Sequence, residues 1–242
     1  MTTPDTSAAS APTRIPFVTD AVRLVRVLFS PTAVFEEQRE QPTFWIPWVV
    51  TGVAFAAIQM LSFPFTLQAA RMASEARGQA LPAAAEGMMR VLTPVTTLVF
   101  MLIMLLVTAG VMYLTLLASA SEVRYKGLLT VAVFTTPLAI LQALLTFVVL
   151  KLRGPEGLHT LADFQVSFGL DLLLPQDASL PKFVEGLLRG ISPLSLWGLA
   201  LTAIGGRTME KTAKGSAWAA ASVSFALGLL LGAVLSGMGG AR

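Results

Sequence analysis

The chain has 242 residues, of which 55% are hydrophobic and 13% are charged, and its formal net charge at pH 7 is +3. Soluble domains carry about 25% charged residues, so this composition, with a mean hydropathy of +0.72, indicates an integral membrane protein. The 17 basic residues are scattered, which argues against nucleic acid as a partner. There is no cysteine and one histidine, His159, so disulfides and thiolate metal sites are excluded.

Residues 1–13 are small and polar, and they lack the basic and apolar regions of a secretory signal. We expect them to form a disordered tail. Residues 14–42 are predicted to form amphipathic helices at the membrane interface. The second of these helices begins at Ser30-Pro31, a typical cap followed by a proline, and ends at Gln41-Pro42.

The first amphipathic helix is predicted over residues 18–29. Its apolar residues share one face, and Asp20, Arg23 and Arg26 lie opposite. Two interpretations are open. The helix lies at the interface with Arg23 and Arg26 toward the lipid headgroups, or it packs on the protein's own helices.

The first membrane span is predicted over residues 43–65. It begins with Trp45 and Trp48, an aromatic pair expected at the level of the headgroups. Residues 66–91 are more polar and rich in alanine, and they predict a loop with helical pieces. The second span is predicted over residues 93–120.

The second span is expected to begin at Thr93-Pro94, another cap followed by a proline. A short linker joins it to a third span over residues 128–150, so these two spans are antiparallel neighbours. The third span contains Pro137, which removes one helical hydrogen bond and is expected to kink the helix. Gln142 is its most polar side chain.

Pro137 and Gln142 allow two interpretations. The kink and the amide of Gln142 form a substrate site, or the neighbouring polar groups have a structural role. In the second case Thr135, Thr136 and Gln142 satisfy the freed backbone groups or bond a neighbouring helix.

A third amphipathic helix is predicted over residues 180–191, where Glu185 and Arg189 are spaced as an ion pair on an exposed face. The fourth span follows over residues 192–208. From Pro193 to Thr208 it has 16 residues, about 24 Å of helix against roughly 30 Å of hydrocarbon. We therefore expect a bend at Pro193, with the preceding helix sunk into the bilayer and Trp197 near the interface.

The fifth span is predicted over residues 217–238. Small residues recur in it at every fourth position, a pattern that lets another helix approach closely. These residues are Ser224, Gly228, Gly232 and Ser236. The partner helix belongs to the same chain or to a second copy.

Orientation follows from the basic loops 121–127 and 206–216, which predict a cytoplasmic N-terminus. Catalysis is not expected, because His159 has no nucleophile signature near it and no predicted span contains an acidic residue. No metal-binding or phosphate-binding motif is present, so we expect neither a metal site nor another cofactor site.

Two segments together resemble the Yip1-domain family. The segment "LFSPTAVFEEQREQPTFWIPWVV", residues 28–50, is similar to the entry helix and first span of that family, with prolines at characteristic places. The segment "LLRGISPLSLWGLALTAIGG", residues 187–206, followed by "KTAKGSAWAAASV", is similar to its fourth and fifth spans. The matching positions in the first segment are Pro31, Phe35, Pro42 and Pro47.

The resemblance implies an all-α, polytopic helical bundle of five transmembrane helices, with a cytoplasmic N-terminus and interfacial helices. Eukaryotic members take part in vesicle trafficking, membrane shaping and binding of Rab GTPases. Their Asp-Leu-Tyr-Gly-Pro and Gly-Thr-Pro-Leu-Tyr motifs are absent here, and the closest stretch is "FTTPLAI", residues 134–140. This difference favours a prokaryotic member located in the bacterial inner membrane.

Two functions are therefore considered. The first is a non-catalytic protein that organises the lipid bilayer or binds a membrane-protein partner or a second copy of itself. The second is a component of a transporter or permease for a neutral or lipidic substrate. A cavity that reaches Gln142 would favour the second function, and a solid bundle would favour the first.

Overall fold

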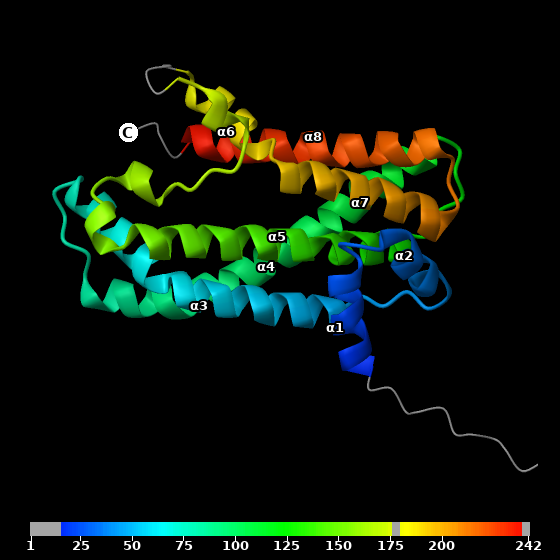
Figure 1. Ribbon diagram of the computed structural model, residues 1–242, viewed down its shortest axis with the longest axis horizontal. Helices are drawn as coiled ribbons and strands as arrows, with labels where there is room; N and C mark the ends of the chain where they lie inside the picture. Colours follow the sequence, from blue (N-terminus) through cyan, green and yellow to red (C-terminus); the bar gives the residue numbers. More distant parts are fainter. Residues whose placement is uncertain (1–15, 176–179, 239–242) are drawn as a thin grey trace, which may run out of the picture.

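The computed structural model describes residues 16–175 and 180–238, whose regular structure is entirely helical (Figure 1). The predicted tail, residues 1–13, lies outside the described residues. The helices are α1 (Pro16–Arg26), α2 (Pro31–Glu40), α3 (Trp45–Glu75), α4 (Ala83–Ala118), α5 (Tyr125–Arg153), α6 (Lys182–Gly190), α7 (Pro193–Glu210) and α8 (Lys214–Met238). Short 3₁₀ turns follow α5 at Pro155–Gly157, Leu161–Phe164 and Leu170–Leu173.

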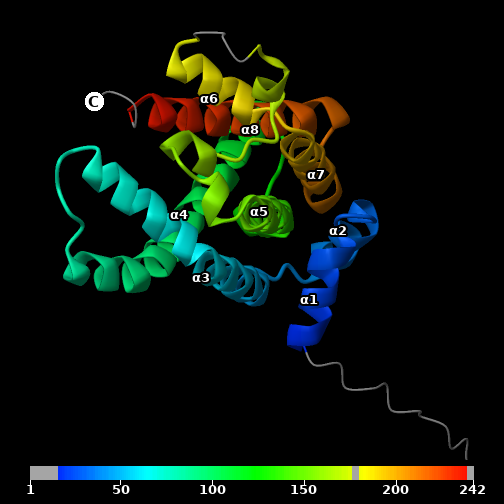
Figure 2. The same cartoon turned by 60° about the vertical axis from the view of Figure 1, so that its left-hand side comes forward.

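Within the described ranges, four helices are long and apolar enough to cross a membrane, namely α3, α4, α5 and α8. The bent pair α6–α7 provides a fifth crossing if it is counted as one span. Helix α5 lies in the middle of the bundle in contact with α3, α4 and α7, and α8 packs on α4, α6 and α7 (Figure 2). The predicted all-α, multi-span architecture is confirmed.

The bend expected at Pro193 is present. Helices α6 and α7 are inclined by 60° across a break of two residues. The break is capped reciprocally: the N–H of Ser195 donates to Ser192 Oγ at 3.1 Å, and the N–H of Ser192 donates to Ser195 Oγ at 2.8 Å. Proline at the first position of α7 needs no hydrogen-bond acceptor, so the chain changes direction there without an unsatisfied donor.

Residues 66–91 contain the predicted helical pieces, but their loop is limited to residues 76–82. Helix α3 continues to Glu75 and α4 already begins at Ala83, so Pro94 lies inside α4 and does not start it. The two extensions stand out from the bundle as a hairpin (Figure 2). Residues of high helix propensity, mainly alanine, build it. The guanidinium of Arg71 joins its two arms, donating to both oxygens of Glu86 at 2.7 and 2.9 Å.

The bundle has two dissimilar ends (Figure 1). We call the end that carries α1, α2 and the α7–α8 turn the α2 end, and the opposite end, which carries α6 and the α3–α4 turn, the α6 end. The main core cluster lies toward the α2 end, where most residues of α5 between Gly127 and Leu138 are buried. Farther along α5, toward the α6 end, only Leu150 is buried.

Helix α1 lies crosswise to the bundle helices at the α2 end (Figures 1 and 2). Its buried side is formed by Leu24 and by Asp20, which is only 2% exposed. Its apolar side points away from the protein, with Val18, Val22 and Val25 exposed, and Phe29 is exposed in the turn that follows the helix. The packing interpretation is confirmed, because one side of α1 packs on the bundle. The interfacial position stays a prediction, with the apolar side uncovered.

The arginines of α1 form ion pairs within the protein, and their contact with lipid headgroups stays a prediction. Arg23 donates to Glu37 of α2 and to Asp20, each at 3.1 Å, and Arg26 donates to Glu37 at 2.9 Å. Partial burial acts to raise the pKa of Glu37, but the hydrogen bonds from Arg23 and Arg26 outweigh it and hold this pKa below its usual value. Glu37 is therefore ionised at neutral pH and neutralises much of the positive charge of α1.

A candidate ligand cavity

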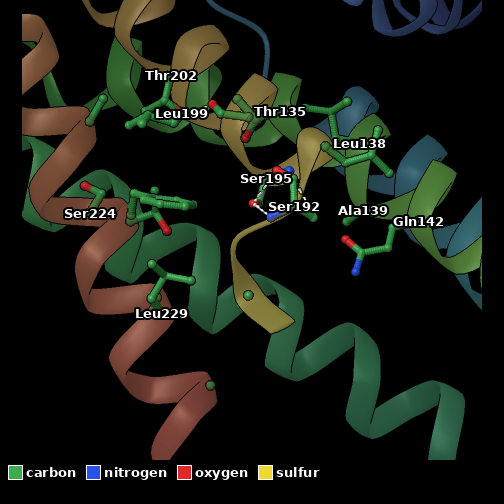
Figure 3. Close-up of a pocket in the computed structure, with 18 of the residues that line it drawn as sticks. Thr135, Leu138, Ala139, Gln142, Ser192, Ser195, Leu199, Thr202, Ser224 and Leu229 are labelled. Atoms are coloured by element: carbon green, nitrogen blue, oxygen red, sulfur yellow. Dashed lines mark hydrogen bonds between the residues drawn. The ribbon is translucent and has the colours of Figure 1, made fainter. Parts of the chain in front are cut away.

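A cavity of about 430 Å³ lies where α4, α5, α6, α7 and α8 meet (Figure 3). Three features that the sequence offered separately form its walls: the stretch of α5 around Pro137, the break between α6 and α7, and the small residues of α8. The wall residues used below are Thr108, Thr135, Leu138, Ala139, Gln142, Gly186, Arg189, Gly190, Ser192, Ser195, Leu199, Ser224, Phe225, Gly228, Leu229 and Gly232.

The α5 wall contains the proline and the amide that the sequence singled out. Pro137 has no N–H, so the carbonyl of Val133 loses its helical donor. The hydroxyl of Thr136 donates to that carbonyl at 2.6 Å, and Thr135 donates to Ala132 at 2.7 Å. The threonines thus have the predicted structural role. Gln142 does not have this predicted structural role, because its side-chain amide bonds no residue that the structure describes.

The wall at the helix break contains one charged group, the guanidinium of Arg189. It donates to Glu185 and to Gln165 Oε1, each at 2.8 Å, and to Asp171 at 3.4 Å. The predicted pair between Glu185 and Arg189 is confirmed. Arg189 therefore ties α6 to the segment that follows α5, and its charge is balanced by two carboxylates.

The α8 wall differs from the prediction. A Cβ atom added at Gly228 or Gly232 would meet nothing within 4 Å, so these residues do not make a close helix contact. The close contact uses glycines of α6 instead. A Cβ at Gly186 would lie 2.9 Å from Ala233 Cα and 3.1 Å from Ser236 Cβ, and one at Gly190 would overlap Leu229. Of the predicted face, Ser236 thus meets a helix of the same chain, whereas a partner helix for Gly228 and Gly232 stays a prediction.

Ser224 Oγ is fully buried and has no hydrogen-bond partner in the described part of the chain. It lies on α8, across the Ser192–Ser195 turn from Gln142 (Figure 3). The hydroxyl of Thr108 on α4 is likewise unpartnered among the described residues. The cavity is therefore lined by apolar groups together with three hydrogen-bonding groups whose capacity is unused.

A second hollow of about 520 Å³ lies between α3 and α5. It shares Ala139 and Gln142 with the first cavity, so Gln142 borders both. Its far wall includes Leu150 and Phe164, which places it toward the α6 end. The bundle is thus packed at the α2 end, and toward the α6 end an open hollow lies on each side of Gln142, which is itself exposed.

The predicted interfacial tryptophans occupy different environments. Trp45 is 66% exposed. Trp48 packs against the core, with its ring 6.0 Å from that of Trp45, and its indole nitrogen is buried. Trp197 is partly exposed in the first turn of α7. An interfacial position of Trp45 and Trp197 stays a prediction, whereas the burial of Trp48 indicates a packing role.

The cavity offers no arrangement for covalent chemistry. His159 is exposed in a turn, where its backbone N–H donates to Asp163 at 2.9 Å. The pKa of Asp163 lies below its usual value, because the backbone N–H and the hydroxyl of Thr160 and then the N–H of His159 donate to it. In the described ranges, no three side chains of the metal-binding types lie close enough to hold an ion. The lining of the cavity is suited to binding a molecule.

Two of its features were missed in the sequence. Gly186 and Gly190 are four residues apart on α6, which is the same small-residue spacing that drew attention to α8. This spacing is visible in the sequence, but the charged residues around the two glycines made it easy to overlook. The unpartnered hydroxyls of Thr108 and Ser224 gave no signal, because only the packing of α4 against α8 decides whether a hydroxyl finds a partner.

Comparison with known proteins bears on the resemblance noted at residues 28–50 and 187–206. The Yip1 domain matches residues 25–236, which includes all the spans and α6. No curated protein and no solved structure matches the chain. The Yip1 family is a non-catalytic family of membrane trafficking, which agrees with the absence of catalytic motifs. With the match extending over nearly the whole multi-span bundle, the chain belongs to the Yip1-domain family.

Proposed function

We propose that this protein organises the bilayer without catalysis and that α1 acts as a wedge in one leaflet. The observation that carries the proposal is the uncovered apolar side of α1, where Val25 is 60% exposed, continued by Phe29, 82% exposed in the turn that follows the helix. Because α1 lies crosswise to the spans, it runs along the membrane plane when the spans run along the membrane normal (Figure 1). A helix in this position buries its apolar side at the boundary between headgroups and acyl chains.

The charges of α1 indicate how it would bind lipid. Arg23 and Arg26 pair with Glu37, so α1 offers little free positive charge to anionic headgroups. Burial of apolar surface, at about 25 cal/mol per Å², is then the main attraction. Insertion of α1 should therefore depend weakly on lipid charge and on salt.

The test is a double substitution on the uncovered side of α1 and in the turn that follows it, Val22→Ser with Phe29→Ser. Reconstituted into neutral phosphatidylcholine vesicles, the wild type is expected to produce narrow, highly curved membranes in electron micrographs, and the variant to leave the vesicles round. Both side chains are exposed, so the fold should be retained. Val99→Ser, on the exposed surface of α4, is the matched control. Vesicles curved equally by the double variant would contradict the wedge.

We further propose that the protein is a prokaryotic member of the inner membrane with its N-terminus in the cytoplasm. The lack of the GTPase-related motifs around residues 134–140 supports the first part. The basic loops 121–127 and 206–216 support the second, since they share the α2 end with α1. Binding of a membrane-protein partner or of a second copy belongs to the same proposal.

A second candidate function is passage of a neutral or lipidic substrate. It is favoured by the hollows that meet at Gln142, which was the feature chosen to distinguish the two functions. Vesicles containing the protein are expected to accelerate transfer of a fluorescent phospholipid between leaflets, measured by dithionite quenching. Gln142→Leu should slow this transfer several-fold, whereas Gln79→Leu, in the exposed α3–α4 turn, should not. Transfer at the rate of empty vesicles would exclude this function for phospholipids.

A further inference from the structure

The hollows on either side of Gln142 contain hydrogen-bonding groups that no residue described in the structure bonds. They include the amides of Gln142 and Gln59, the hydroxyl of Thr108 and the buried Oγ of Ser224. Within the hydrocarbon region no bulk water is available, so polar groups must be satisfied by the protein or by a bound molecule. The occupant of the cavity should therefore both donate and accept hydrogen bonds.

The ionisable residues around the hollows restrict which molecules can bind there. Arg189 is the only ionisable residue among the described residues that line the two hollows, and three acceptors hold its guanidinium. An anionic headgroup would find no free cation there, and a cationic one would find no free carboxylate. Since a charge in a low-dielectric site is costly unless it is paired, the occupant should be uncharged.

The size and lining of the two hollows restrict the choice of occupant further. The first hollow has about 430 Å³ and the second about 520 Å³, each within the range of small-molecule sites, roughly 300–1,000 Å³. Away from Gln142 their walls are largely apolar, with Leu199 and Leu229 in the first and Phe55 and Phe65 in the second. Polar side chains also line both hollows, among them Ser224 in the first and Gln59 in the second. Two mostly apolar hollows that meet at Gln142 fit a molecule with two hydrocarbon chains and a small polar head.

We propose that these hollows bind an uncharged glycerolipid of the diacylglycerol type. Its hydroxyl and ester groups bond Gln142 and Ser224, and one acyl chain lies in each hollow. The lipid enters from the α6 end, because the packed core around Phe134 and Met112 closes the α2 end. This inference rests on the second candidate function for the location of the site, but it concerns binding alone.

The experiment uses the full-length protein in phosphatidylcholine nanodiscs with a diacylglycerol that carries a photoactivatable group on an acyl chain. The wild type is expected to be labelled on peptides of α5 around residues 139–146 and on α8. Gln142→Leu removes a hydrogen bond of about 1–1.5 kcal/mol, so labelling at low probe concentration should fall about five- to tenfold. Gln79→Leu is the matched control and should be labelled like the wild type.

Gly228→Leu is a second variant that blocks the site by filling it. Nothing lies within 4 Å of a Cβ at this position, so the larger side chain should enter the first hollow without disturbing the fold. It is expected to abolish labelling of α8 while the unfolding temperature is unchanged. A photoactivatable phosphatidylglycerol, the anionic probe, should label these peptides weakly.

Three results would overturn the proposal: labelling that is unchanged in both variants, labelling by the anionic probe at the same peptides with equal efficiency, or labelling confined to the outer surface of α4. The lipid-transfer assay is independent of this one. Labelling without transfer would retain the site and reject transport, and transfer without labelling would retain transport and reject the site.

Discussion

Phe35→Ala is expected to lower the free energy of unfolding by about 3–5 kcal/mol, the usual cost of truncating a buried phenylalanine. Phe35 is 0% exposed and belongs to the main core cluster of the bundle. Its ring lies 6.3 Å from that of Phe134 on α5, edge to face. It also fills the space over Gly205 of α7, where an added Cβ would lie 2.9 Å from the end of the ring. Truncation would leave a cavity between three helices.

The measurement is thermal unfolding in detergent micelles, followed by size-exclusion chromatography of heated samples. Phe29→Ala is the matched control, since it removes the same ring from an exposed position nearby. It should leave the unfolding temperature within error of the wild type, and Phe35→Ala should lower it clearly. Equal unfolding temperatures for the two variants would mean that α2 contributes nothing to the stability of the bundle.

Gly169→Ala is expected to detach the segment before α6 from the helix that it covers. An added Cβ would lie 2.6 Å from the carbonyl oxygen of Leu188 and nearer still to that of Arg189. Both are backbone atoms at the end of α6, so neither can move aside cheaply. The displacement would break the hydrogen bond from Leu170 N–H to Ile191, at 3.0 Å, and would separate Asp171 from Arg189.

Hydrogen–deuterium exchange of peptides covering residues 158–175 measures this detachment. A local loss of about 1.4 kcal/mol or more should speed exchange there about tenfold, with little change in α4 and α5. Gly157→Ala is the control, because its added Cβ would lie 3.6 Å from Arg153 Cβ, an ordinary contact. If Gly169→Ala exchanged like the wild type, the segment would not be held by this contact.

The sequence predicted the helices well, but it predicted the residues at which they begin and end less well. Apolar runs of span length predicted α5 and α8 closely, because the bilayer sets how many apolar residues a crossing needs. The α3–α4 hairpin was predicted as a loop with helical pieces because its local composition is polar. Its helices persist beyond the apolar runs, and the Arg71–Glu86 pair that links them joins residues 15 apart in sequence. A contact between residues that far apart cannot be predicted from a local sequence pattern.

The amphipathic helices were a similar case. Periodicity predicted which residues of α1 share a face, but it could not decide which face meets the protein. That depended on Glu37 of α2, which pairs with both arginines and draws the polar side of α1 inward. In the same way the Gly-rich face of α8 was visible, but only the position of α6 decided that Gly186 and Gly190 make the close contact and that Gly228 faces open space.

The sequence by itself determined that this is a helical membrane protein, that the chain breaks at Pro193, and to which family it belongs. It could do so because hydropathy, proline and capping chemistry act over a few neighbouring residues. Only the tertiary structure decided that Gln142, the break and the small residues of α8 border one cavity. A cavity exists where side chains from distant segments fail to fill the space between them. Whether they fail depends on how the helices cross, which no single segment encodes.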